Sequence, residues 1–175
     1  AACPGRAVLL PGDLGRREDC ARLALDAAAG LGGLDLLVCN AAPAALAMPF
    51  LAQTPEECLA FVRDSLALLV GPLQALLPGL RPGATVVYVS STYLRAPRAQ
   101  FSHYLAAKGA AEALVRGLAE EFSHLRFILF RPPRMLTDQT SAPFDPEPGV
   151  SAVAVARDLL EALNQPQAPG LREIG

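Results

Sequence analysis

Short apolar runs alternate with longer amphipathic segments along the chain, and this alternation limits the fold more than any other feature of the sequence. The runs are apolar at consecutive positions, as strands buried on both faces of a parallel sheet require. They occupy residues 6–11, 34–39, 84–89 and 126–130, and a last run begins at residue 171. The segments between them have apolar residues at helical spacing and occupy residues 18–29, 55–77, 104–122 and 151–163. The pattern predicts one α/β domain over residues 1–175, with helices on both faces of a parallel sheet.

Composition and charge exclude several classes of protein. Hydrophobic residues make up 52% of the chain, which argues against disorder. With a net charge of −2 and 18% charged residues, the chain has no basic field for nucleic acid or an anionic membrane surface. No uninterrupted apolar stretch is long enough to predict a bilayer span. The four cysteines lie far apart without metal-ligand spacing, so we expect reduced thiols, no metal site and a cytoplasmic protein.

Small, polar and turn-forming residues follow each of the first four runs. In parallel α/β sheets ligands bind beyond the carboxyl ends of the strands, so these residues predict one shared crevice. In chain order they are Asp13 and Leu14, then Asn40, Ala41 and Ala42, then Ser90 and Ser91, then Arg131, Pro132 and Pro133.

Tyr104 and Lys108 lie four residues apart near the start of a predicted helix, and therefore on one face of it. Lys108 is the only lysine among the 15 basic residues of the chain. A cation beside a phenol lowers the pKa of the tyrosine and makes it a useful acid or base near neutral pH. Ser91 follows a predicted strand, so its hydroxyl can reach the same crevice. Alone, the pair is a weak signal, because tyrosine–lysine pairs are common on helices.

In this order and spacing the motifs resemble the short-chain dehydrogenase/reductase family over about residues 12–175. Ser91, Tyr104 and Lys108 fall on the family's catalytic serine, tyrosine and lysine. Ser65 falls on its helix asparagine, whose carbonyl holds a water for proton relay. Further residues match the family's cofactor-binding motifs. They are Asp13 and Leu14 at the adenine contact, Asn40, Ala41 and Ala42 at the Asn-Ala-Gly motif, Pro132 and Pro133 at the Pro-Gly turn, and Thr137 at the nicotinamide carboxamide.

The resemblance implies an NAD(P)-dependent oxidoreductase that interconverts a ketone and a secondary alcohol by hydride transfer. Tyr104 would exchange a proton with the substrate oxygen, and Ser91 would hydrogen-bond that oxygen. Lys108, together with Tyr104, would bind the nicotinamide ribose. The substrate is then a small-molecule carbonyl or alcohol. The choice between NAD and NADP stays open, as does that between a free-standing enzyme and a ketoacyl reductase domain of a larger synthase.

Departures from the family pattern leave an alternative open. The family's first strand, Gly-rich phosphate loop, first helix and second strand have no counterpart in this sequence, so the resemblance implies a Rossmann-like doubly wound sheet that is incomplete at its N-terminus. That unit lies outside the sequence, comes from another chain, or has been lost. Ser65 in place of asparagine and Pro133 in place of glycine are smaller departures. The alternative to an enzyme is a non-catalytic scaffold or partner-binding domain of the same fold.

Three polar residues beside the motifs have simpler interpretations. Ser90 is predicted to cap the turn after its strand. His103 is predicted to be exposed or at the rim of the substrate site. Arg131 is predicted to be solvated, with contact to a cofactor phosphate as the alternative.

The predicted helices at residues 55–77 and 104–122 carry small or apolar residues on more than one face. A helix that covers a sheet needs one apolar stripe, so a wider one implies a second burial partner. The family pairs these helices with their copies across a two-fold axis, which implies a homodimer or a tetramer that contains it.

Overall fold

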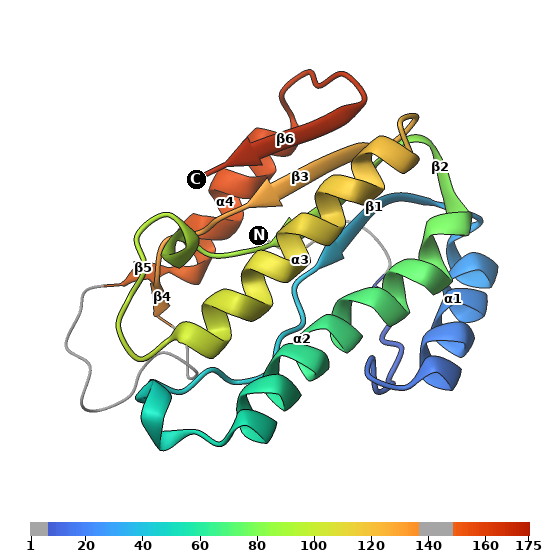
Figure 1. The fold of residues 1–175 in the computed structure, drawn as a ribbon. Helices are drawn as coiled ribbons and strands as arrows, with labels where there is room; N and C mark the ends of the chain where they lie inside the picture. The colour runs from blue at the N-terminus through green and yellow to red at the C-terminus, as the bar shows by residue number, and fades with distance from the viewer. Residues whose placement is uncertain (1–6, 137–148) are drawn as a thin grey trace.

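Four parallel strands form the central sheet of the computed structural model, which describes residues 7–136 and 149–175 (Figure 1). Their order is β1-β2-β3-β6. The strands are β1 (Leu34–Cys39), β2 (Leu80–Val89), β3 (Arg126–Phe130) and β6 (Gly170–Ile174). The helices are α1 (Arg17–Leu31), α2 (Pro55–Leu76), α3 (Ser102–Glu121) and α4 (Ala152–Leu163). Short elements complete the described chain: β4 (Met135–Leu136), β5 (Val150–Ser151), η1 (Phe50–Ala52), η2 (Leu77–Gly79) and η3 (Thr92–Leu94).

Helices cover both faces of the sheet, as the alternation of apolar runs predicted (Figure 1). Successive side chains of a strand point to opposite faces. On one face Val86 and Phe127 pack with α2 and α3, while on the other Val87 and Ile128 pack against Val155 of α4. Residues 86–89 of β2 and 127–130 of β3 are therefore apolar at consecutive positions, because a helical layer covers each face of these strands.

The pairing of the strands brings their carboxyl ends to one edge of the sheet. Val89, the last residue of β2, lies opposite Phe130, the last residue of β3, and Cys39 lies opposite Tyr88. Ser90 extends this pairing, because its backbone N–H donates to the Phe130 carbonyl at 2.7 Å. The loops that follow β1, β2 and β3 consequently start side by side, which is the edge where the sequence predicted a crevice.

Helix α2 begins at the residue that the sequence indicates. The Thr54 hydroxyl accepts from the Glu57 N–H at 3.1 Å, and the Glu57 carboxylate accepts from the Thr54 N–H at 2.8 Å. This capping box satisfies two N–H groups that a helix end otherwise leaves unpaired. It fixes the start of the helix that carries Ser65.

One predicted strand is absent. Residues 7–11 form no strand, and Val8 and Leu9 are 51% and 91% exposed. A strand needs a neighbouring backbone to pair with, and among the described strands β1 pairs only with β2. The apolar run at 6–11 therefore has the composition of a strand but no partner here, so the strand prediction is wrong for the described residues of this run.

Helix α2 with η2, Pro55–Gly79, is long and apolar enough by length and composition to cross a membrane, although Arg63 and Asp64 interrupt its apolar residues. Core helices meet the same criterion, so this is weak evidence for a membrane span. Leu69 and Leu73 are each 2% exposed and fix the helix to the sheet. Most of the other residues of α2 are half-buried, and Leu59 is 68% exposed.

The two helical layers allow a matched test of the core. Val115 of α3 is fully buried, whereas Val153 of α4 is 70% exposed. Val115→Ala is expected to lower the free energy of unfolding by about 2 kcal/mol, because it removes two buried methyl groups and leaves a cavity. Val153→Ala is expected to change it by less than about 0.5 kcal/mol. Denaturant unfolding of both variants checks this, and equal effects would contradict the assigned packing.

Candidate active site

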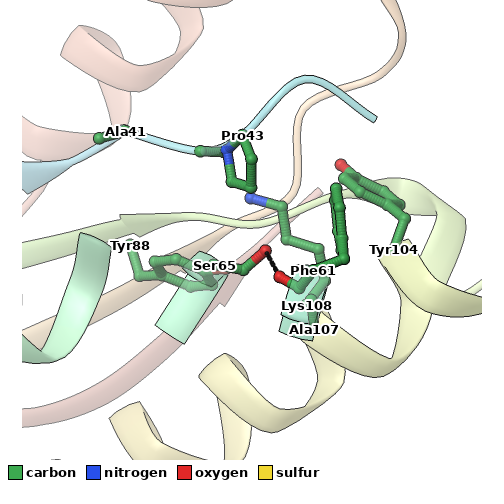
Figure 2. A pocket seen from close by; sticks show the side chains of 9 residues that line it. Ala41, Pro43, Phe61, Ser65, Tyr88, Tyr104, Ala107 and Lys108 are labelled. Atoms are coloured by element: carbon green, nitrogen blue, oxygen red, sulfur yellow. Dashed lines mark hydrogen bonds between the residues drawn. The ribbon is translucent and has the colours of Figure 1, made fainter. Parts of the chain in front are cut away.

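A pocket of about 270 Å³, including its open mouth, lies between the loop after β1, helix α2 and the first turns of α3 (Figure 2). The predicted tyrosine and lysine both line it. The full lining is Ala41, Ala42, Pro43, Phe61, Ser65, Tyr88, Tyr104, Ala107 and Lys108. Four parts of the chain that are distant in sequence therefore meet at the edge of the sheet predicted for the crevice.

Lys108 is 7% exposed and reaches along the pocket with its ammonium at the end of β2. Its Nζ donates to the Val89 carbonyl at 2.8 Å and lies 5.0 Å from the centre of the Tyr88 ring. Burial lowers the pKa of Lys108 to about 8, against the opposing effect of Glu112. Val89 O is the only acceptor of this ammonium within the described residues. Donor capacity therefore remains for a ligand hydroxyl.

The pKa of Tyr104 is raised, whereas the sequence predicted that Lys108 would lower it. Burial raises it, the Ser91 hydroxyl lowers it as a hydrogen-bonding neighbour, and Tyr93 raises it further. The predicted lowering by the lysine does not occur, because Lys108 directs its ammonium to Val89 O and lies 5.8 Å from the centre of the Tyr104 ring. Without a bound ligand, the phenol of Tyr104 therefore keeps its proton at neutral pH.

Ser91 lies next to this phenol, as the sequence predicted. It follows β2, is 8% exposed and caps η3 by accepting from the Tyr93 N–H at 3.2 Å. The same hydroxyl affects the Tyr104 phenol. Edge-to-face contacts of Tyr93 and Phe101 with Tyr104, at 6.3 and 6.1 Å between ring centres, hold the phenol in place.

Ser65 also lines the pocket, but its hydroxyl is turned to its own helix. It donates to the Phe61 carbonyl, one turn earlier in α2, at 2.7 Å (Figure 2). This bond to the preceding turn is the usual way in which a serine satisfies its hydroxyl inside a helix. Ser65 therefore shapes the wall of the pocket opposite Lys108 with its hydroxyl already used.

Only part of the predicted cofactor-binding set meets in the pocket. Ala41 and Ala42 line it, and their small side chains leave the backbone at the end of β1 open. Asn40 is exposed, and its side chain makes no hydrogen bond in the described part of the chain. Asp13 and Leu14 are not among the residues that line the pocket, and the Asp13 carboxylate accepts from the Gly15 N–H at 2.9 Å in the turn before α1. Leu14 accepts from the Cys20 thiol beside that helix.

The predicted cofactor-binding residues after β3 differ in their surroundings. Pro132 is buried, and its carbonyl accepts from the Thr92 hydroxyl at 3.3 Å, which joins this turn to the loop after β2. Pro133 is exposed beside it. Thr137, the predicted carboxamide contact, lies outside the described residues.

Three of the simpler interpretations are wrong. His103 is neither exposed nor at a rim: it is 5% exposed and meets Phe61 edge to face, with ring centres 4.7 Å apart. Ser90 does not cap a turn, because its hydroxyl donates to Glu112 at 2.6 Å. Arg131 is not solvated but 5% exposed, and its guanidinium is bound to Glu112 and Glu173. These ion pairs leave it unavailable to a cofactor phosphate.

Glu112 is the residue that sequence reasoning missed. It lies one helical turn after Lys108, on the buried face of α3, and is 6% exposed. A carboxylate at a position that should be apolar was the available signal. Its function could not be inferred, because its partner Arg131 comes from a distant strand end.

The link between Ser91 and Tyr104 can be tested directly. Ser91→Ala is expected to raise the pKa of Tyr104 further, because the hydroxyl that stabilises the phenolate is lost. Ser102→Ala changes an exposed serine of α3, the helix that carries Tyr104. It is the control and should leave the pKa of Tyr104 unchanged. NMR titration of protein labelled with 13C at tyrosine Cζ measures both. A Tyr104 resonance that titrates identically in all three proteins would contradict this geometry.

Comparison with known proteins places the chain in a family. A family model described as Enoyl-(Acyl carrier protein) reductase matches residues 1–162. The uncharacterized oxidoreductase YghA of Escherichia coli K12 is 32% identical over 120 residues, 68% of this chain and 40% of that protein. Among solved structures, the oxidoreductase yciK from E. coli has 25% identity and a TM-score of 0.80, covering 93% of this chain and 70% of its own. A short chain dehydrogenase from E. coli CFT073 complexed with NADPH has 25% identity and a TM-score of 0.77. The match covers 90% of this chain and 70% of that one.

The chain spans 40% to 46% of the lengths of the curated relatives that it matches. The family match covers most of its residues, and the structural matches extend over the sheet and the helices on both of its faces. The chain belongs to the short-chain dehydrogenase/reductase family.

Proposed function

We propose that this chain carries the reaction centre of an NAD(P)-dependent oxidoreductase that interconverts a ketone and a secondary alcohol. The observation that supports this most is the meeting of Tyr104 and Lys108 in one pocket with Ser91 beside the phenol. The three come from two elements, the end of β2 and the start of α3. The membership of the family and the NADPH bound to one structural relative support the same activity.

The residues of the pocket have distinct functions in this proposal. Tyr104 gives its proton to the carbonyl oxygen during reduction, and burial favours this direction by keeping the phenol protonated. Ser91 donates a hydrogen bond to the same oxygen and stabilises the charge that develops there. Both groups are held by packing, so they lose little freedom when the substrate binds.

Lys108 is proposed to bind the ribose hydroxyls of the cofactor, together with the open backbone at Ala41 and Ala42. Its unused donors and the small neighbouring side chains fit such a group. A nicotinamide cofactor supplies the hydride when bound. With a pKa of about 8 the lysine is mostly charged at neutral pH and loses its charge as the pH rises through that value. We place the protein in the cytoplasm, without a nucleic-acid partner.

Tyr104→Phe in the full-length protein tests the reaction. Reduction of a panel of ketones, including a β-ketoacyl thioester, with NADPH or NADH is expected to fall by about 100-fold or more, because general acid catalysis is lost. Tyr93→Phe keeps the phenol of Tyr104 and is expected to retain most of the activity. Undiminished turnover in Tyr104→Phe would exclude the assignment. If neither cofactor raises the melting temperature of the unmodified protein, the scaffold alternative is favoured.

We further propose that the open faces of α2 and α3 pair with those of a second copy in a homodimer. Leu59 of α2 is 68% exposed, and α2 packs side by side with α3. An exposed leucine on this pair of helices supports a contact there with the same helices of a second copy.

Leu59→Arg is expected to convert the dimer to a monomer, because it places a charge in the proposed contact. Leu160→Arg changes a leucine of α4 that is 60% exposed on the other side of the sheet, and should leave the dimer intact. Light scattering coupled to size exclusion measures the mass of each. A monomeric mass for the unmodified protein at all concentrations would disprove the dimer.

A further inference from the structure

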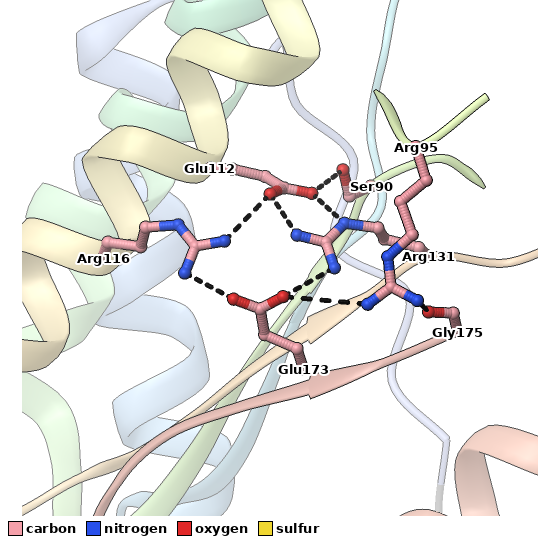
Figure 3. Close-up of polar contacts among 7 residues, drawn as sticks. All are labelled: Ser90, Arg95, Glu112, Arg116, Arg131, Glu173 and Gly175. Atoms are coloured by element: carbon pink, nitrogen blue, oxygen red, sulfur yellow. Dashed lines mark hydrogen bonds and ion pairs between the residues drawn. The ribbon is translucent and has the colours of Figure 1, made fainter. Parts of the chain in front are cut away.

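A buried cluster of charges joins α3 to the ends of β3 and β6 (Figure 3). Arg131 and Glu112 form its centre, with side chains 5% and 8% exposed. They are joined by two hydrogen bonds, from Nε at 2.7 Å and from Nη2 at 2.5 Å. Arg131 also donates to Glu173 of β6 at 2.8 Å. Arg116, at the exposed side of the cluster, contacts Glu173 at 2.5 Å and Glu112 at 3.4 Å.

This cluster is connected to the pocket through consecutive residues of the chain. Ser90 donates its hydroxyl to Glu112 at 2.6 Å, and Val89, one residue earlier, accepts from Lys108 at 2.8 Å. Ser91, one residue later, lies beside Tyr104. The end of β2 is thus held against α3 at two adjacent residues, immediately before the proposed substrate-binding serine.

The cost of burying such a pair argues for a function beyond packing. Two charges removed from water lose their hydration, and apolar side chains of similar size often stabilise a fold equally well. The pair here is fully hydrogen-bonded, which limits that cost. Its contacts fix the position of α3 relative to β2 more narrowly than apolar contacts would, because hydrogen bonds have a direction.

We propose that Glu112 and Arg131 are positioning residues: Glu112 fixes the end of β2 against α3 and places a negative charge one helical turn from Lys108, while Arg131 holds Glu112 in place and keeps it charged. The effect of these residues on catalysis rests on the proposed function. Their effect on the position and charge of Lys108 does not, because it involves only residues of this chain.

The other groups around Lys108 do not supply this charge. Tyr104 on α3, Tyr88 on β2 and Cys39 on β1 are neutral near pH 8, because burial raises the pKa of each. From α2 the pocket receives Phe61 and Ser65, which do not titrate.

The carboxylate itself stays charged. Burial by itself raises the pKa of Glu112, but hydrogen bonds from Arg131 and Ser90 outweigh it and the pKa lies below its usual value. Glu112 is therefore the negative group that acts on Lys108, and Arg131 is the cation bound to its carboxylate.

The single lysine of the sequence makes a direct test practical. In protein labelled with 13C at lysine Cε, NMR follows one side chain, Lys108, through its titration. Glu112→Gln removes the negative charge and is expected to lower the pKa of Lys108 by about one pH unit. Arg131→Met removes the guanidinium that keeps the Glu112 carboxylate charged and in place, so it too is expected to lower the pKa of Lys108. Arg116→Met removes a cation that is 44% exposed and screened by water, and should leave the titration within about 0.3 pH unit of the unmodified protein.

A lowered pKa of Lys108 in Glu112→Gln and in Arg131→Met supports the proposal, once circular dichroism shows that each variant folds. A purely structural role predicts no shift, and an unchanged or raised pKa in either folded variant overturns the proposal. Glu112→Asp keeps the charge and should restore the Lys108 titration toward that of the unmodified protein. A titration for Glu112→Asp equal to that of Glu112→Gln counts against the proposal.

Activity gives a second and separate measurement. In Glu112→Gln, kcat for ketone reduction is expected to fall at least tenfold with a smaller change in KM, because groups that act in the transition state are displaced. An unchanged kcat in the folded variant overturns the positioning function. The NMR titration requires neither substrate nor cofactor. If the variants lower the pKa of Lys108 but the unmodified protein shows no turnover, the proposed function fails while the electrostatic coupling stands.

Discussion

The geometry of the site depends on one contact, that between the first half of α3 and the end of β2. Lys108 donates to Val89, and Glu112 accepts from Ser90, so two adjacent residues of the strand are bonded to successive turns of one helix. Ala107 and Ala111, on the same face of α3, are 2% and 3% exposed and allow the helix to lie close to the sheet. Because the helix is held at this distance and rotation, the Tyr104 phenol lies beside Ser91.

Burial determines the electrostatics of the pocket. It lowers the pKa of Lys108 to about 8 and raises that of Tyr104, so the protein disfavours the charged form of both groups. The result is a phenol that keeps its proton and a lysine whose charge is sensitive to its neighbours. In a member of the short-chain dehydrogenase/reductase family, the first property suits proton donation to a carbonyl. The second property means that a nearby charge such as Glu112 changes the pKa of Lys108.

Most elements of the fold could be predicted from sequence because their signals are local. The Thr54 and Glu57 pair marks the start of α2 by a bond between residues three apart, and the run at Arg126–Phe130 is a strand with the predicted limits. The run at residues 6–11 has an equally clear strand composition, and its described part, residues 7–11, forms no strand. Its fate depends on a neighbouring backbone, and no local pattern contains that information.

The sequence by itself determined the α/β class, the edge of the sheet where the pocket lies, and the presence of Ser91, Tyr104 and Lys108 there. Spacing along strands and helices is enough for these, because parallel strands end together and residues four apart share a helix face. Only the tertiary structure decided that Asp13 does not line the pocket, that Arg131 is bound to Glu112, and that the Tyr104 pKa rises. Each of these depends on burial or on a partner distant in sequence. Both desolvation and ion pairing are set by the surrounding atoms rather than by the residue type.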